Sequence, residues 1–185
     1  ASTVLASGVT VGALAAVNAA GSALAPDTGA LYGEFWDESP PPSPRPGLHA
    51  EARRRLTQAQ EETRSRSAGV LRPPFNTTLA VVATDAALTR PQAQKMAGTA
   101  HDGLARAVRP VHLMHDGDTV FALSTCERPL EGTELNDLLA AGADVLTRAV
   151  VKAVLAAEGV DGPGGVFPSY RDLYGRDLHG GPGEG

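Results

Sequence analysis

Cysteine, aromatic residues and long apolar runs are all scarce in this sequence of 185 residues. Its single cysteine, Cys126, excludes a disulfide framework and a cysteine metal site, and it indicates a reducing, cytoplasmic setting. Aromatic residues make up only 4% of the chain, while alanine and glycine are abundant, so we expect close packing of small side chains. No apolar stretch reaches membrane-spanning length, and a net charge of −5 argues against nucleic acid as the main partner.

The start of the chain carries no recognisable targeting signal. The first residue is Ala1, and no basic region precedes the apolar segment at residues 9–17, as it would in a secretory signal peptide. We therefore expect the sequence to begin partway through a longer gene product.

Hydrophobic patterns predict a layered α/β fold. Thr89 has the features of a helix N-cap, with Gln92 as its capping-box partner, and this helix ends before Pro110. A second, longer helix is predicted at residues 135–154. Strands are predicted at residues 10–19, 78–84, 111–114 and 119–125.

Residues 38–70 differ in character from the rest of the chain. They contain a proline-dense stretch, followed by a segment rich in arginine, glutamate, glutamine and serine with almost no large apolar residue. Such a composition is typical of an exposed segment, so we expect a flexible linker in which the second part is a solvated helix or disordered.

The junction Asn76-Thr77-Thr78, which precedes an apolar run, is the most informative feature of the chain. It matches the N-glycosylation pattern, which would require secretion, and it also fits an ordinary strand start because threonine is common in strands. A third interpretation is self-cleavage between Asn76 and Thr77. Thr77 would then carry a hydroxyl nucleophile beside a free amine, which is a complete nucleophile and base. The tripeptide alone favours the strand start, so self-cleavage needs support from other residues.

Asp116-Gly117-Asp118 and Asn18 are the candidate partners. In an extended segment two carboxylates spaced two apart face the same side, where they can orient a hydroxyl, hold an ammonium or share a proton. Asp-Gly is also typical of a hairpin turn, and a metal site is the weakest option because so few ligands are present. The Asn18 amide could donate to an oxyanion, although asparagine at the end of an apolar segment also fits a turn.

Other polar residues receive structural interpretations. His101-Asp102 and His115-Asp116 are not accompanied by the Gly-x-Ser-x-Gly elbow of a serine hydrolase, and His101 is expected to be a packed or surface residue of a helix. Cys126 follows a predicted strand and is expected to be a small buried residue.

Several motifs, taken together as an ordered set along the chain, resemble one family of self-processing enzymes. The family contains the L-aminopeptidase/D-Ala-esterase/amidases, the β-aminopeptidases and the 6-aminohexanoate-oligomer (nylon-oligomer) endohydrolases. Residues 76–86 resemble its processing site and the first strand of its β subunit, and residues 115–123 resemble its carboxylate turn. The other matching segments are residues 9–22 (end of the α subunit), 100–112 (helix and following strand) and 168–173 (C-terminal segment).

The resemblance implies a four-layer αββα sandwich, incomplete in this chain, with no cofactor or metal. Residues 1–76 would be the C-terminal part of the α subunit, and residues 77–185 the β subunit. Thr77 matches the nucleophile, Asp116 and Asp118 match the paired acidic positions, and Asn18 matches the oxyanion-stabilising asparagine. A threonine nucleophile with two aspartates is closer to the nylon-oligomer branch, since the aminopeptidase branch uses serine.

The chain departs from the family in one respect: the active-site lysine should lie upstream of Asn18, and no lysine occurs there. We therefore expect several core strands and one catalytic residue to lie outside this sequence. The resemblance implies a small peptide or amide as substrate and an oligomer of αβ heterodimers. Two alternatives stay open, a related self-processing acyltransferase and a non-enzymatic α/β binding module in which Asn76-Thr77 is only a strand start.

Overall fold

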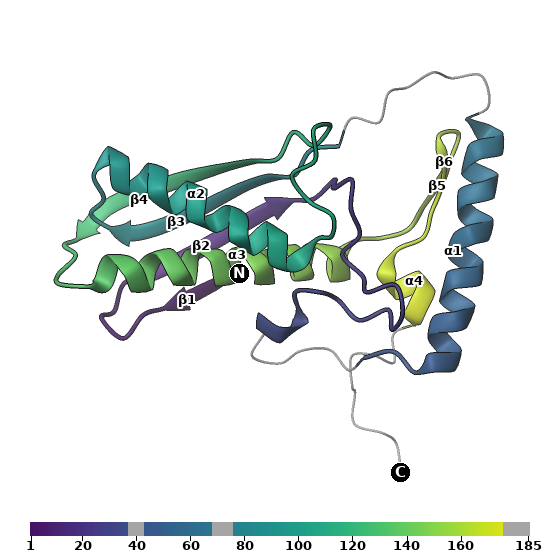
Figure 1. The fold of residues 1–185 in the computed structure, drawn as a ribbon, viewed down its shortest axis with the longest axis horizontal. Helices are drawn as coiled ribbons and strands as arrows, with labels where there is room; N and C mark the ends of the chain where they lie inside the picture. Colours follow the sequence, from purple (N-terminus) through teal and green to yellow (C-terminus); the bar gives the residue numbers. More distant parts are fainter. Residues whose placement is uncertain (37–42, 68–75, 176–185) are drawn as a thin grey trace, which may run out of the picture.

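A four-stranded sheet with the strand order β1-β2-β3-β4 organises the larger part of the molecule (Figure 1). The computed structural model describes residues 1–36, 43–67 and 76–175. The first three strands, β1 (Ser2–Val4), β2 (Thr10–Ala16) and β3 (Leu79–Ala86), are antiparallel neighbours. β4 (Thr119–Arg128) runs parallel to β3, and α2 (Arg90–Ala107) makes the crossover that a parallel pair requires.

Two helices, α2 and α3 (Glu134–Ala156), cover one face of this sheet. α2 begins at the predicted capping box, where the Gln92 side chain accepts hydrogen bonds from the Thr89 N–H and hydroxyl. The helices cross closely at Gly103, where a Cβ atom would lie 2.4 Å from the Ala143 carbonyl oxygen. The core between helices and sheet is apolar and includes Val11, Val82, Met96, Leu104, Leu138 and Leu146.

The opposite face of the same sheet is apolar and exposed. Leu14, Val81 and Phe121 share one rung across β2, β3 and β4. Leu14 and Phe121 are 75% and 57% exposed, and Leu79 and Leu123 on this face are also exposed. An apolar sheet face is normally covered by a second layer. The described residues therefore supply one sheet layer and one helix layer of the four-layer αββα sandwich.

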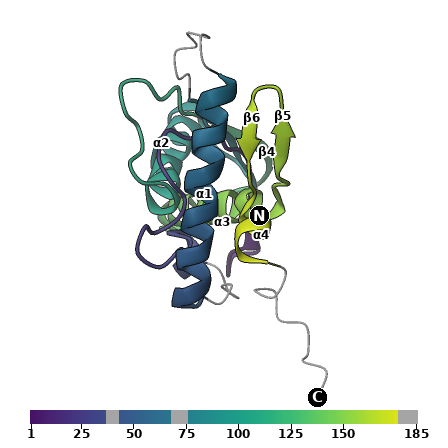
Figure 2. The ribbon, with the colours of Figure 1, turned by 90° about the vertical axis from the view of Figure 1, so that its right-hand side faces the viewer.

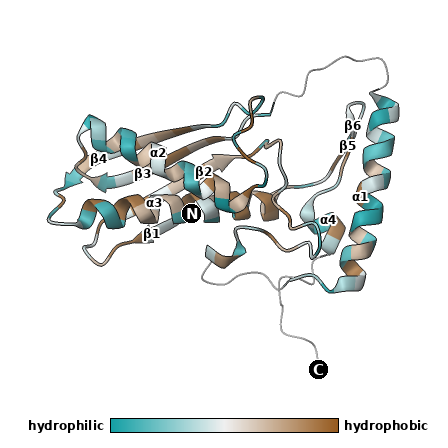
Figure 3. Cartoon of the chain, in the orientation of Figure 1, coloured by the Kyte–Doolittle hydropathy of each residue, from teal (hydrophilic) through white to brown (hydrophobic). Residues whose placement is uncertain are grey.

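The segment expected to be a flexible linker contains a long helix, α1 (Pro46–Arg66), which lies across one end of the molecule (Figure 2). Residues 38–42 and 68–70 of that segment lie outside the described residues. Most of α1 is hydrophilic (Figure 3), and only His49, Ala52 and Ala59 are buried. Because alanine and histidine give a weak hydrophobic signal, the composition indicates solvent exposure although one side of the helix is packed.

α1 packs on a second apolar cluster formed with the C-terminal elements. A hairpin of β5 (Val160–Gly162) and β6 (Gly165–Phe167) leads into α4 (Tyr170–Tyr174). His49 links α1 to α4 through a hydrogen bond of 2.9 Å between its Nδ1 and the Tyr174 hydroxyl. The buried members of this cluster are Leu31, Ala52, Val151, Tyr170, Leu173 and Tyr174.

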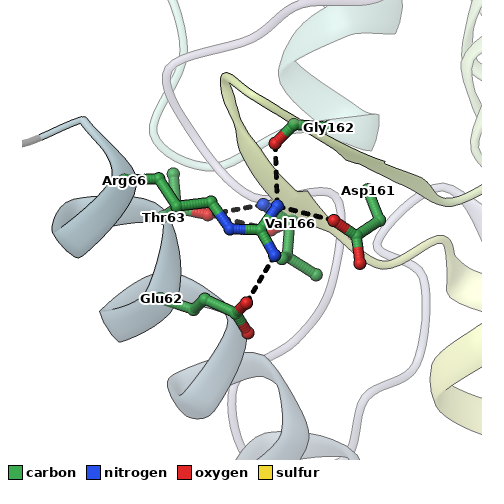
Figure 4. Close-up of polar contacts among 6 residues, drawn as sticks. All are labelled: Glu62, Thr63, Arg66, Asp161, Gly162 and Val166. Atoms are coloured by element: carbon green, nitrogen blue, oxygen red, sulfur yellow. Dashed lines mark hydrogen bonds and ion pairs between the residues drawn. The ribbon is translucent and has the colours of Figure 1, made fainter.

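Polar contacts hold the end of α1 against the hairpin (Figure 4). The Thr63 hydroxyl accepts from the Val166 N–H at 2.9 Å and donates to the Val166 carbonyl at 3.1 Å. Arg66 donates to Asp161 at 2.6 Å and to the Gly162 carbonyl at 2.7 Å, and it also pairs with Glu62. α1 is therefore attached through both backbone and side-chain groups of the hairpin.

Two local predictions are wrong. Residues 111–114 form no strand, since His112 adopts a left-handed backbone with φ of 58°. Cys126, expected to follow a strand and to be buried, lies inside β4 and is exposed. It has a φ of 59°, and it lies at the point where the pairing of β4 with β3 becomes irregular, near Ala86. Among the described residues, each helix is too short or too polar to span a lipid bilayer.

Candidate active site

The Asn76–Thr77 bond lies between the segment that follows β2 and the loop that precedes β4. On one side the Thr77 N–H donates to the Asn18 main-chain carbonyl at 2.8 Å. On the other side Asn76 forms a parallel bridge with Asp116, and the Gly117 N–H donates to the Asn76 carbonyl at 2.8 Å. Thr77 thus extends β3 between two neighbouring chain segments, and this pairing fixes its backbone.

The Thr77 hydroxyl points back to the peptide bond that precedes it. It donates to the Asn76 carbonyl oxygen at 2.7 Å, and the contact is partly buried. The side chain is therefore next to the carbonyl group that it would attack in a self-cleavage reaction.

The two predicted carboxylates bind backbone N–H groups around this junction. Asp116 accepts from the Ala20 N–H at 3.2 Å through Oδ1 and from the Leu113 N–H at 3.1 Å through Oδ2. Asp118 accepts from the Thr78 N–H at 2.9 Å, and its side chain is only 3% exposed. Asp116 thereby anchors the segment after Asn18, and Asp118 anchors the residue after Thr77.

A pair of histidines completes the surroundings of Asp118. His112 Nδ1 lies 2.9 Å from the second Asp118 oxygen, and the His101 ring meets the His112 ring edge-on with centroids 4.8 Å apart. Burial lowers the pKa of His101, and the neighbouring His112 lowers it further. His112 was not among the predicted site residues, and its position six residues before Asp118 in an irregular loop gave no usable signal.

The structure brings together all five residues singled out at the sequence level, namely Asn18, Asn76, Thr77, Asp116 and Asp118. Asn18 reaches Thr77 through its main-chain carbonyl, so a role for its amide stays a prediction. The Asp116-Gly117-Asp118 segment is not the tip of a hairpin. It leads into β4, where the Thr119 N–H continues the pairing by donating to the Thr78 carbonyl at 2.9 Å.

Known proteins resemble this chain in sequence and in fold. The model of a family described as peptidase family S58 matches residues 1–167. An uncharacterized aminopeptidase of Mycobacterium tuberculosis is 44% identical over 191 residues, which cover 94% of this chain and 51% of the relative. One from Mycobacterium leprae is 37% identical, with coverage of 94% and 47%. The chain therefore spans about half the length of the curated relatives it matches.

Solved structures show the same fold. A β-aminopeptidase of a Burkholderia species matches with a TM-score of 0.54 at 20% identity, covering 95% of this chain and 46% of the other. The L-aminopeptidase D-Ala-esterase/amidase of Ochrobactrum anthropi, described as a variant of the Ntn hydrolase fold, matches with a TM-score of 0.53 at 20% identity. That match covers 87% of this chain and 40% of the other. The fold is thus part of an Ntn-hydrolase sandwich. Because the family model matches residues 1–167, the chain belongs to peptidase family S58.

Proposed function

We propose that this chain supplies the nucleophile of a self-processing amide hydrolase, an aminopeptidase or amidase, in which cleavage of the Asn76–Thr77 bond releases Thr77 as an N-terminal residue. One observation carries the proposal: the Thr77 hydroxyl lies 2.7 Å from the carbonyl oxygen of that same bond, inside a backbone arrangement anchored by Asp116 and Asp118. The aminopeptidase names of the relatives support the reaction class.

The maturation reaction has two steps. The Thr77 Oγ adds to the Asn76 carbonyl carbon, the bond to the Thr77 nitrogen breaks, and the hydroxyl proton is transferred to that nitrogen. The product is an ester between the Asn76 acyl group and Thr77 Oγ, with a free amine on Thr77. Water then hydrolyses the ester, leaving a carboxylate on Asn76 and restoring the Thr77 hydroxyl.

In turnover the freed Thr77 Oγ attacks the carbonyl carbon of a substrate amide, the C–N bond breaks, and the amine leaves with the hydroxyl proton. Water then hydrolyses the acyl-enzyme ester, which releases the acid and restores the Thr77 hydroxyl. The base is the Thr77 amine, which as an α-amino group has a typical pKa of about 8, or the Asp116 and Asp118 pair. The Asn18 amide is proposed to stabilise the oxyanion. These steps use only protein groups.

Within this class, the substrate is a small peptide or amide. The combination of Thr77 with Asp116 and Asp118 favours linear amide oligomers such as 6-aminohexanoate oligomers as a second candidate. The proposal includes a cytoplasmic location and assembly as an oligomer of αβ pairs.

An acyltransferase, which passes the acyl group to an amine instead of water, is distinguished by adding an acceptor amine to the reaction and identifying the acylated product.

Intact-mass measurement of the full gene product that includes residues 1–185 tests the proposal. We expect two pieces, the second beginning at Thr77. Thr77→Ala removes the hydroxyl and should abolish both cleavage and activity, whereas Thr77→Ser keeps a hydroxyl at the same position and should still be cleaved. An uncut wild-type chain with full amidase activity would refute self-processing, and an uncut chain that forms no acyl-enzyme with an electrophile would favour a binding module.

A further inference from the structure

The carbonyl group of the Asn76–Thr77 bond receives hydrogen bonds from two donors. One is the Thr77 hydroxyl at 2.7 Å, and the other is the Gly117 N–H at 2.8 Å. When the hydroxyl attacks, its proton is lost and negative charge develops on the Asn76 oxygen. The Gly117 N–H is then the donor that stays in place, at a distance typical of the groups that stabilise an oxyanion.

The backbone that carries this donor is held on both sides. Asp116, which precedes Gly117, is tied through its carboxylate to Ala20 and Leu113. Asp118, which follows it, is tied to Thr78 and His112. A donor fixed in this way needs little reorganisation during the reaction, which is the condition under which oxyanion stabilisation is most effective.

The absence of a side chain at Gly117 also matters to the nucleophile. A Cβ atom at this position would lie 2.6 Å from Thr77 Oγ1, but 3.5 Å from Thr77 Cβ and Cγ2. The clash would therefore affect the hydroxyl alone, and rotation of the Thr77 side chain would relieve it. That rotation would move the hydroxyl away from the Asn76 carbonyl, so a methyl group at position 117 would disable the nucleophile while leaving the backbone in place.

We propose that Gly117 is a catalytic residue of the cleavage reaction: its N–H stabilises the oxyanion formed on Asn76, and its missing side chain provides the space in which the Thr77 hydroxyl faces the carbonyl. This inference rests on the proposed self-processing at Asn76–Thr77. Gly117 thus acts directly on the carbonyl group that is attacked, whereas the two flanking aspartates accept hydrogen bonds from backbone N–H groups.

The experiment compares Gly117→Ala with wild type and with Gly98→Ala in the full gene product. Gly98 is an exposed helical glycine with no atom within 4 Å of an added Cβ, so its substitution is the matched control. Intact mass against time gives the cleavage rate. We expect wild type and Gly98→Ala to be cleaved alike, and Gly117→Ala to be slower by about 100-fold or more, the loss typical of a misplaced reacting group, because the added methyl turns the Thr77 hydroxyl away from the Asn76 carbonyl.

Two further measurements separate chemistry from folding. The urea midpoint of Gly117→Ala should match that of uncut Thr77→Ala, since both are full-length precursors. Replacing Gly117 by glycolic acid exchanges only its N–H for an ester oxygen, and this variant should also be cleaved slowly. If Gly117→Ala does not fold, the cleavage rate of the ester variant tests the role of Gly117. Cleavage of either variant at the wild-type rate overturns the role of Gly117, whereas a wild type uncut at Asn76–Thr77 overturns the proposed function and this inference together.

Discussion

Removing the Asp118 carboxylate should destabilise the junction by an amount that depends on which group replaces it. In the structure this carboxylate accepts from the Thr78 N–H and contacts His112 Nδ1, each at 2.9 Å. Thr78 is only 2% exposed, so water cannot easily replace the lost acceptor. Leaving a buried N–H without a partner costs about 1–3 kcal/mol. The contact with His112 adds little, because that side chain is partly exposed.

We therefore expect Asp118→Ala to lower the free energy of unfolding by about 1–3 kcal/mol. Asp118→Asn keeps a carbonyl oxygen for Thr78 and places an amide near His112, so its cost should stay below about 1 kcal/mol. With a urea m-value at the upper end of the usual range, about 3 kcal/mol per molar, the alanine variant should unfold at a midpoint lower by about 0.3–1 M.

The assay is urea unfolding followed by circular dichroism, with both substitutions placed in the Thr77→Ala background, in which the proposed cleavage cannot occur, so that every sample is one chain. Equal midpoints for Asp118→Ala and the background would refute the argument from the buried N–H. Equal loss in the alanine and asparagine variants would show that the charge, and not the acceptor, stabilises the junction. In the cleavable protein, Asp118→Asn then isolates the charge, and a loss of activity with normal stability would assign a chemical role to the carboxylate.

Two further predictions concern the core and the histidine pair. Leu146→Ala should lower the free energy of unfolding by about 2–5 kcal/mol, because Leu146 is fully buried beneath α2. The control Val160→Ala, at an exposed position, should change it by at most about 0.5 kcal/mol. Similar urea midpoints for the two variants would contradict the packing of α3. His101 should titrate below its ordinary pKa of 6.5, because burial and the neighbouring His112 disfavour its charged form. Its contribution to stability is therefore complete above pH 6.5 and is lost as the pH falls through the lowered pKa. An NMR titration of the imidazole measures this pKa, and a value at or above 6.5 would contradict the prediction.

The regular elements of the sheet and its helices could be predicted because their signals are local. Alternation along β3 and helical spacing along α2 and α3 reflect burial on one face, and the Thr89 capping box marks a helix start within a few residues. α1 escaped a firm prediction because its buried residues are two alanines and a histidine, which give a weak hydrophobic signal. The short strands β1, β5 and β6, of three residues each, are too brief to show a period.

The candidate site could be predicted only in part, because it is assembled from segments far apart in the sequence. Asn18, Thr77 and Asp116 are brought together by the pairing of neighbouring strands, and no local pattern reports that pairing. Their order along the chain was informative only through the resemblance to a family. The bonds that each carboxylate makes, and the positions of Gly117 and His112 beside the junction, depend on a loop whose irregular backbone the sequence does not encode in any simple pattern.

The contacts in the uncut chain also bear on which group would serve as the base after the proposed cleavage. Both aspartates are already engaged, each accepting a backbone N–H that holds the strands around Thr77. If either took a proton from the nucleophile, that support would be weakened at the moment when the geometry matters most. The Thr77 nitrogen, in contrast, is positioned by the Asn18 carbonyl before it becomes an amine. It stays on the same residue as the hydroxyl, and its lone pair, delocalised in the amide, becomes basic only when the bond to Asn76 is cut. Under the proposed mechanism the geometry therefore favours the amine as the base and the aspartates as the groups that hold it in place.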